Sequence, residues 1–299
     1  MTEARNMLTE RDVALLCDLY KYRYLSVSQI RRLHFPSLQT AYRRLRALMA
    51  LGLIKSFLAP HITEHIYYLD MAGAIQVAGS LGVEVSELRW TQNARTPKDY
   101  YFLRHFLAVS DFRIALTGAC GESGIRLLGF IPEYYGEKSE RGLVTKYIKD
   151  YVCDIGDHSR KMTHTPDAVF ALEKNGRPAL FFLEIDRGTE VIGDEEKGVL
   201  KCAKFYLNYL VGGQYRRYEA DFGCAPFKGF RALIVTTSEQ RVENIRQAVT
   251  TRLSFPDKAR QFIWLASNGQ VRVNDTSSGV FSSTWRSADA GDSTLYRIG

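Results

Sequence analysis

Three carboxylates in the second half of the chain have the types and spacing of a site for a divalent cation. Glu184 and Asp186 lie at the end of an apolar segment, 179–185, that predicts a buried strand, and alternate strand residues share a face. Asp167 begins the neighbouring predicted strand and can converge with them. Hard carboxylate oxygens suit Mg²⁺, which can activate water and stabilise a phosphate transition state.

The same residues resemble a known nuclease motif. Pro166-Asp167 followed by Glu184-x-Asp186 is similar to the motif of the PD-(D/E)xK nuclease family, in which a Pro-Asp pair precedes an acid-x-Lys. In this chain Asp186 holds the lysine position and Arg187 follows it, and a guanidinium cannot act as a base.

The resemblance implies a nuclease site in this domain, and the residues of that site would be catalytic if the domain is an active nuclease. Its carboxylates would be Asp167, Glu184 and Asp186, and Mg²⁺ would bind Asp167 and Glu184. A lysine from the following predicted helix would replace the missing one. We assign that role to Lys201, and the alternatives are Lys197 and Lys204.

Plainer interpretations of the acids stay open. Each acid can be a polar strand end that bonds a neighbouring side chain, such as Arg187, Thr165 or Thr189. Arg187 can also neutralise the acids in place of a metal, as it would in a decayed site. Glu133, just past another predicted strand, is a candidate fourth ligand, although acids in loops are frequent.

A zinc site is the weaker hypothesis. Cys153, His158 and His164 offer zinc ligands, but their spacing contains no tight pair. Cys153 and His158 fall in a long polar insertion, 133–163, which His164 directly follows, and a polar loop is the better interpretation. The Lys and Arg residues of this insertion are explained equally well by solvation and by phosphate contact.

Positive charge is concentrated near the N-terminus. Between Asp18 and Glu64 the sequence has no acidic residue, and its basic residues there are Lys21, Arg23, Arg31, Arg32, Arg43, Arg44, Arg46 and Lys55. A solvated surface usually mixes both signs of charge. A one-sign segment with helical periodicity therefore favours a surface that binds a polyanion.

The apolar pattern of this segment predicts three helices followed by a hairpin. Thr9, Ser26 and Ser37 are typical N-cap residues, each placed just before a run with helical periodicity. The segments 54–58 and 65–69 then predict two strands. This order is that of a winged helix-turn-helix.

The third predicted helix carries the hypothesis of DNA binding. Its apolar stripe faces inward, which turns outward Gln39, Thr40, Arg43, Arg44 and Arg46. Gln and Arg can bond base edges in the major groove, and Arg also binds phosphate. We predict that double-stranded DNA contacts Arg31, Arg32, Ser37, Gln39, Thr40, Arg43, Arg44, Arg46 and Lys55. A solvated basic face is the plainer alternative.

The remaining elements predict a mixed α/β chain of two domains. The second domain has the order α-β-β-β-α-β, with the Asn175-Gly176 pair typical of a tight hairpin. The predicted organisation is a winged helix-turn-helix over 1–70, a helical connector over 71–96, a PD-(D/E)xK nuclease-like domain over 97–270 and a loosely packed polar tail over 271–299.

A more particular resemblance covers nearly the whole chain. The winged-helix pattern, H-F-L-A-V-S-D-F at 105–112, T-P-D-A at 165–168 and L-E-I-D-R-G-T-E at 183–190 together resemble the bacterial replication-relaxation family. Its members occur on plasmids and integrative elements, and the Glu-x-Asp-Arg pattern is usual among them. The sequence has no His-x-His cluster beside a nucleophilic Tyr, which a rolling-circle relaxase would need.

Composition sets the outer limits. The 299 residues are 45% hydrophobic and 24% charged, which excludes a largely disordered chain. The longest apolar run, Ala47–Ile54, is far shorter than the roughly 18 residues of a membrane span. The N-terminus has no apolar stretch typical of a signal peptide, and the five cysteines form no close pairs. We therefore expect a cytoplasmic protein with reduced thiols, and the net charge of +7 permits a nucleic-acid partner.

Three functions compete. The first is a sequence-specific DNA-binding protein of a mobile element that acts in replication or transcription, with an inactive nuclease-like domain. The second is a Mg²⁺-dependent endonuclease targeted by its winged helix. The third is a protein-interaction module whose basic helix binds an acidic partner. We expect a homodimer because winged-helix regulators usually read paired half-sites. Nothing in the sequence indicates a membrane or small-molecule partner.

Overall fold

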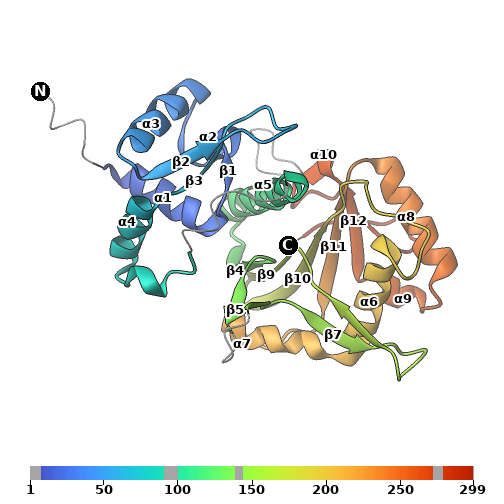
Figure 1. Ribbon diagram of the computed structural model, residues 1–299. Coiled ribbons are helices and arrows are strands. Elements are labelled where there is room, and N and C mark those ends of the chain that lie inside the picture. The colour runs from blue at the N-terminus through green and yellow to red at the C-terminus, as the bar shows by residue number, and fades with distance from the viewer. Residues whose placement is uncertain (1–7, 91–99, 139–143, 272–278, 299) are drawn as a thin grey trace, which may run out of the picture. The chain divides into compact units, whose positions relative to one another are not determined.

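The chain folds into two compact units. The computed structural model describes residues 8–90, 100–138, 144–271 and 279–298, and the units are Met1–Ile114 and Ala115–Gly299 (Figure 1). The division falls within one helix, α5 (Tyr100–Ser123). Among the described residues, no helix combines the length and the apolar character that crossing a bilayer requires.

The first unit has the predicted order of three helices and a hairpin. Its elements are α1 (Glu10–Tyr22), β1 (Leu25–Ser26), α2 (Val27–His34), α3 (Leu38–Ala50), β2 (Ile54–Phe57), β3 (Ile66–Leu69), α4 (Met71–Leu81) and the short 3₁₀ helix η2 (Val85–Glu87). The strands form an antiparallel sheet in the order β1-β3-β2.

The helices of this unit begin at the predicted caps. The side chains of Thr9, Ser26 and Ser37 each accept a hydrogen bond from the backbone N–H three residues later. These bonds satisfy N–H groups that have no partner within the helix. The helices then bury their apolar stripes, including Leu16, Ile30 and Leu45, in one core.

The boundary between the units lies later than the sequence predicted. The predicted connector helix is α4, but its Ala74 and Val77 belong to the core of the first unit. The first half of α5 also packs there, because the side-chain amide of Gln29 donates to the Leu107 carbonyl at 2.8 Å and Arg32 pairs with Asp111. The predicted boundaries at residues 70 and 96 thus separate segments that share one core.

The second unit is built on a seven-stranded sheet. Its main strands are β4 (Arg126–Pro132), β9 (Ala168–Lys174), β10 (Arg177–Ile185), β11 (Phe230–Thr236), β12 (Ile263–Ser267), β13 (Trp285–Ser287) and β14 (Leu295–Tyr296). The order across the sheet is β14-β13-β12-β11-β10-β9-β4. Strands β10, β11 and β12 are parallel, whereas β9 is antiparallel to both β10 and β4.

Helices α6 (Gly198–Gly212) and α8 (Glu239–Arg252) cover one face of this sheet (Figure 1). Phe182 of β10 and Ile234 of β11 share a core with residues of both helices. The hairpin signal is confirmed, since Asn175 and Gly176 both have positive φ (52° and 72°), as a two-residue turn between β9 and β10 requires. The remaining elements of the unit are β5 (Gly136–Lys138), β6 (Val144–Lys146), β7 (Asp150–Cys153), β8 (Lys161–His164), η3 (Gln214–Arg217), α7 (Tyr218–Phe222), α9 (Asp257–Arg260) and α10 (Asn268–Val271).

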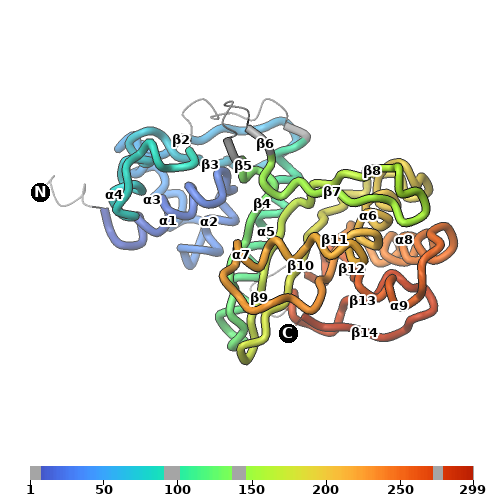
Figure 2. The backbone as a smooth tube through the Cα atoms, turned by 90° about the horizontal axis from the view of Figure 1, so that it is seen from below, coloured from blue at the N-terminus to red at the C-terminus, as the bar shows by residue number. Residues whose placement is uncertain are grey.

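The β7–β8 part of the predicted polar insertion is packed into the fold. Strands β7 and β8 pair as a hairpin that lies against α6 (Figures 1 and 2). The hairpin buries Val152 and Met162, which pair across its two strands, in the main core, while Cys153, next to Val152, stays exposed. The prediction of a polar loop was wrong for this hairpin, because each short strand buries one apolar residue, Val152 or Met162, between two exposed neighbours.

A buried acid anchors this hairpin. Asp150 is 6% exposed and accepts hydrogen bonds from the hydroxyls of Tyr209 and Tyr218, at 2.8 and 2.7 Å. Arg217 pairs with its other oxygen at 2.8 Å. Both carboxylate oxygens are therefore bonded, which offsets the cost of burying the charge.

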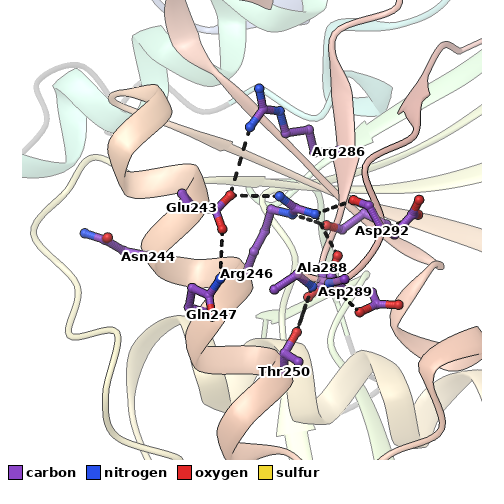
Figure 3. A network of polar contacts seen from close by, with 12 residues as sticks. Glu243, Asn244, Arg246, Gln247, Thr250, Arg286, Ala288, Asp289 and Asp292 are labelled. Carbon is purple, nitrogen blue, oxygen red and sulfur yellow. Dashed lines mark hydrogen bonds and ion pairs between the residues drawn. The ribbon is translucent and has the colours of Figure 1, made fainter.

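The C-terminal segment is not a loose tail in its described part, residues 279–298. Strands β13 and β14 extend the main sheet, and Trp285 is fully buried. Arg246 of α8 holds the segment: its guanidinium donates to the carbonyls of Ser287 and Asp289 at 2.7 Å, and to the carbonyl of Asp292 at 2.5 Å (Figure 3). Polar composition predicted a tail because these bonds use backbone oxygens, which composition does not report.

Removing the Arg246 side chain tests this anchor. In Arg246→Ala three carbonyls lose a charged donor, so we expect the free energy of unfolding to fall by about 2–4 kcal/mol. Denaturant unfolding measures this loss, and limited proteolysis should cut first within 279–298. The control is Arg286→Ala, whose side chain is 42% exposed and 4.0 Å from Glu243. Its change should stay within about 0.5 kcal/mol, and equal losses in both variants would contradict the anchor.

Candidate nucleic-acid interface and carboxylate cluster

One face of α3 presents polar side chains to solvent. Gln39, Arg43 and Arg46 are exposed and lie at i, i+4 and i+7 along the helix, so they form one stripe. Leu45 and Leu48, on the opposite face, are fully buried. The amphipathic pattern of the sequence therefore places this stripe outward, as predicted.

Arg44 does not belong to that stripe. Its guanidinium bonds both oxygens of Asp12, Nε at 2.7 Å and Nη2 at 2.5 Å, and Asp12 is only 1% exposed. Burial opposes ionisation of Asp12, yet the bonds from Arg44 and Thr9 hold the pKa of this carboxyl below its usual range. The prediction that Arg44 points outward is wrong, because the residue joins α3 to α1.

Other predicted DNA-binding residues are partly committed to contacts inside the unit. Arg32 forms an ion pair with Asp111, and Lys55 pairs with Asp70 at 2.9 Å. The Ser37 hydroxyl caps α3, and Thr40 donates its hydroxyl to the Ser37 carbonyl at 2.8 Å. Arg31 is half-buried.

A hollow of about 790 Å³ lies between α3 and the start of α1. Thr40, Arg43 and Ala47 of α3 line one wall, and Arg11 and Phe35 contribute to the other. The guanidinium of Arg11 lies 5.3 Å from the centre of the Phe35 ring, which places a second exposed cation beside Arg43. The sequence analysis missed Arg11, because it precedes the segment that has no acidic residue.

A second cluster forms at the end of β10 in the other unit. Glu184 lies on the face covered by α6, where the Tyr206 hydroxyl donates to its Oε1. The Nε2 atom of His164, from the end of β8, lies 2.6 Å from the same oxygen. The Sγ atom of Cys202 lies 3.8 Å from that Nε2 atom. One carboxylate, one imidazole and one thiol therefore converge.

The environment shifts the protonation of this cluster. Burial raises the pKa of Glu184, and the neighbouring His164 only partly offsets the effect. Burial by itself would lower the pKa of His164, but the Glu184 carboxylate outweighs it and raises the pKa above its usual value. Burial also raises the pKa of Cys202 and Tyr206 well above the ordinary range.

Asp167 lies beside this cluster, as we expect from its position at the start of the strand that pairs with β10. Its Oδ2 atom accepts the backbone N–H of Ile185 at 2.6 Å, which joins it to the end of β10. Its own backbone carbonyl accepts the N–H of Glu133 at 2.8 Å. The Glu133 side chain pairs with Lys146. Glu133, the predicted fourth ligand, therefore lies next to Asp167 in space, and its carboxylate is ion-paired with Lys146.

The carboxylate of Asp186 is bonded to α8 and not to the groups described around Glu184. Its carboxylate forms an ion pair with Arg241 (2.5 and 3.0 Å), accepts the Thr236 hydroxyl at 2.6 Å and accepts the Gly188 N–H at 2.9 Å. Strand alternation predicted that Asp186 and Glu184 share a face, but the strand ends at Ile185, and Asp186, the next residue, bonds a different helix.

The lysines of α6 contribute little to the cluster. Lys201 is exposed, and Lys204 pairs with Asp154 at 2.8 Å. The residues that α6 directs toward Glu184 are Cys202 and Tyr206. The assignment of Lys201 as a catalytic lysine stays a prediction.

The donor set does not fit Mg²⁺. This ion prefers oxygen ligands in octahedral geometry. Here Glu184 Oε1 already bonds His164 and Tyr206, and Asp186 is held by Arg241. The cluster also offers a nitrogen, from His164, and a sulfur, from Cys202, so it differs from an all-oxygen Mg²⁺ site.

Sequence reasoning missed the residues that surround Glu184. His164 lies three positions before Asp167 in the sequence, and the weak zinc hypothesis combines it with Cys153 and His158 instead. The hairpin register separates that group, because His164 pairs with Asp150 and Cys153 pairs with Lys161. Helical periodicity does predict that Cys202 and Tyr206, four residues apart, share one side of the helix over 193–210, but no local pattern connects that side to Glu184.

The chain is thus a two-unit α/β protein with a basic helix in one unit and an acidic cluster in the other. It matches the model of the replication-relaxation family over residues 16–223, and it belongs to that family. This match confirms the family resemblance seen in the sequence.

Other comparisons add little. A solved structure of the restriction endonuclease FokI bound to DNA is similar at 9% sequence identity and a TM-score of 0.26. The match covers 87% of this chain and 43% of that one, so this chain spans less than half of its length. A likeness at this score supports no conclusion about the site. No curated protein matches the chain.

The ion pair between Asp186 and Arg241 can be tested by its removal. Arg241→Ala leaves a carboxylate that is 4% exposed without its cation, so we expect a loss of about 3–5 kcal/mol in the free energy of unfolding. Denaturant unfolding measures it. Asp186→Asn in the same background should recover part of the loss, because it removes the unpaired charge.

The matched control is Gln240→Ala, an exposed neighbour on α8. Its unfolding free energy should change by no more than about 0.5 kcal/mol. If Arg241→Ala changes stability no more than Gln240→Ala does, the pair is not structural.

Proposed function

We propose that this protein binds double-stranded DNA in a sequence-specific manner through α3 of an N-terminal winged helix-turn-helix. The exposed stripe of Gln39, Arg43 and Arg46 carries the proposal. These side-chain types make paired hydrogen bonds to adenine and guanine, and a single helix face fits the major groove. The hairpin of β2 and β3 is the wing.

Charge supports the same conclusion. The segment from Leu19 to Thr63 has no acidic residue. None of its side chains therefore repels the negatively charged phosphates of DNA. Arg11 adds a cation beside the stripe. An acidic protein partner would also be attracted to this surface, but it would not need the Gln and Arg pairing geometry.

We propose further that the second unit is a PD-(D/E)xK nuclease-like domain without nuclease activity. The succession α5, β4, β9, β10, α6 and β11 supports this type of core, and the acids lie at the expected strand ends. The Asp186–Arg241 ion pair occupies the position of the catalytic lysine. An acid held by a guanidinium neither donates nor accepts a proton readily.

The biological role that fits these features is that of a mobile-element protein in replication, relaxation or transcription. Family membership supports it. The expected location is cytoplasmic, on a plasmid or the nucleoid. The homodimer stays an expectation, and light scattering that gives a mass near 34.0 kDa would reject it.

DNA binding is tested with variants of the stripe. The probe is a fluorescent duplex selected from a randomised pool by the wild-type protein, and anisotropy is measured over a range of salt concentrations. Arg43→Ala with Arg46→Ala should weaken binding at least tenfold, since each base contact contributes about 1–3 kcal/mol. Each lost phosphate contact should lower the salt slope by about 0.9.

The control removes two exposed cations of the other unit, Lys174→Ala with Lys228→Ala. It should leave affinity for the selected duplex within twofold. Unchanged affinity in the stripe variant, with its fold intact by circular dichroism, would refute DNA docking through α3. The remaining explanation would then be an acidic protein partner.

Cleavage of supercoiled plasmid carrying the selected site tests the second unit. We expect no nicking with Mg²⁺, because Asp186 is ion-paired and Glu184 is bonded to His164 and Tyr206. DNA binding should survive Asp167→Ala and Glu184→Ala. Mg²⁺-dependent cleavage by the wild type that both substitutions abolish would establish the endonuclease instead, a function favoured by the proximity of Asp167 to the end of β10.

A further inference from the structure

The convergence of His164, Glu184 and Cys202 has the composition of a metal site. Their ligand atoms, Nε2, Oε1 and Sγ, all lie within 4.8 Å of one another. The residues come from β8, β10 and α6, three separate elements of one unit. Local sequence does not bring such donors together, so the tertiary fold places them.

The distances suit a tetrahedral ion. Zn–N bonds of about 2.0–2.1 Å and Zn–S bonds of about 2.3 Å place nitrogen and sulfur ligands about 3.6 Å apart. The observed separation of His164 Nε2 and Cys202 Sγ is 3.8 Å. The separation of His164 Nε2 and Glu184 Oε1 is 2.6 Å, and it would lengthen to about 3.4 Å when an ion replaces the shared proton.

The surroundings of the cluster favour a cation. Asp167 lies next to Glu184 at the end of β10, because its Oδ2 atom accepts the backbone N–H of Ile185 at 2.6 Å. Its carboxylate adds negative charge beside the three candidate ligands. A divalent cation is attracted to that charge and, once bound, favours the thiolate form of a cysteine ligand.

The type of ion follows from the donors. Imidazole and thiolate are borderline-to-soft ligands that favour Zn²⁺ and Co²⁺ over Mg²⁺. The side chains of Glu184, Cys202 and His164 are largely buried, and Tyr206 donates to Glu184 as an outer partner that can orient it. In a four-coordinate site, three protein ligands leave one position for water, as in catalytic zinc sites.

We propose that His164, Glu184 and Cys202 bind one divalent ion of the zinc class in the second unit. The binding displaces the proton that His164 and Glu184 share and the proton of the Cys202 thiol. This site is independent of DNA binding by α3, so either proposal can fail without the other.

Cobalt spectroscopy tests the site on the full chain. After treatment with a chelator and its removal, the protein is titrated with Co²⁺ alone. We expect visible bands of tetrahedral Co²⁺ and a near-ultraviolet thiolate-to-cobalt band that saturate at one ion per chain. Zn²⁺ should abolish both bands at equimolar concentration, whereas millimolar Mg²⁺ should leave them.

Variants assign the ligands. Cys202→Ser should remove the thiolate band, and His164→Gln should weaken Co²⁺ binding more than tenfold. Cys153→Ser is the matched control, since this cysteine is exposed on the same hairpin as His164 and should leave both bands unchanged. Circular dichroism checks that each variant is folded.

Three results would overturn the proposal. They are the absence of saturable bands in the folded wild type, a thiolate band that persists in Cys202→Ser, and displacement of Co²⁺ by millimolar Mg²⁺. The last result would return the cluster to an oxygen-ligand site built on Asp167 and Glu184.

Discussion

A charge removed from water needs a partner, and this constraint decides what the acids and arginines of the protein can do. Asp12 is buried against Arg44, Asp150 against two tyrosines and Arg217, and Asp186 against Arg241. Each pair joins two elements, so the ion pairs that satisfy burial also hold helices to one another or to strands. A carboxylate or guanidinium that is bonded in such a pair is not available to bind a ligand.

The same constraint separates two kinds of arginine on one helix. Arg44 lies only one position from Arg43, yet Arg44 pairs with a buried acid and Arg43 faces solvent. The helical turn of about 100° per residue produces the difference. The acid-free segment therefore presents less charge than its sequence suggests, and the charge that remains is concentrated on the Gln39–Arg46 face.

In the second unit the partners of each acid determine its chemistry. Asp186 has a guanidinium and becomes structural, whereas Glu184 has an imidazole, a phenol and a nearby thiol. A guanidinium keeps its proton, but an imidazole and a thiol can give theirs up to a metal ion. Two acids that lie two residues apart at the end of β10 thus have different capacities, because α8 contacts Asp186 and α6 contacts Glu184.

The sequence by itself determined most elements of both units, because caps, helical periodicity, apolar strands and the Asn175-Gly176 turn are local signals. It also determined the outward stripe of α3 and the family. Only the tertiary structure decided that Arg44 is a structural residue, that 279–298 completes the sheet, and that His164 and Cys202 reach Glu184. These outcomes depend on contacts between residues far apart in the chain, such as Arg246 with Ser287, and no local pattern encodes such a contact.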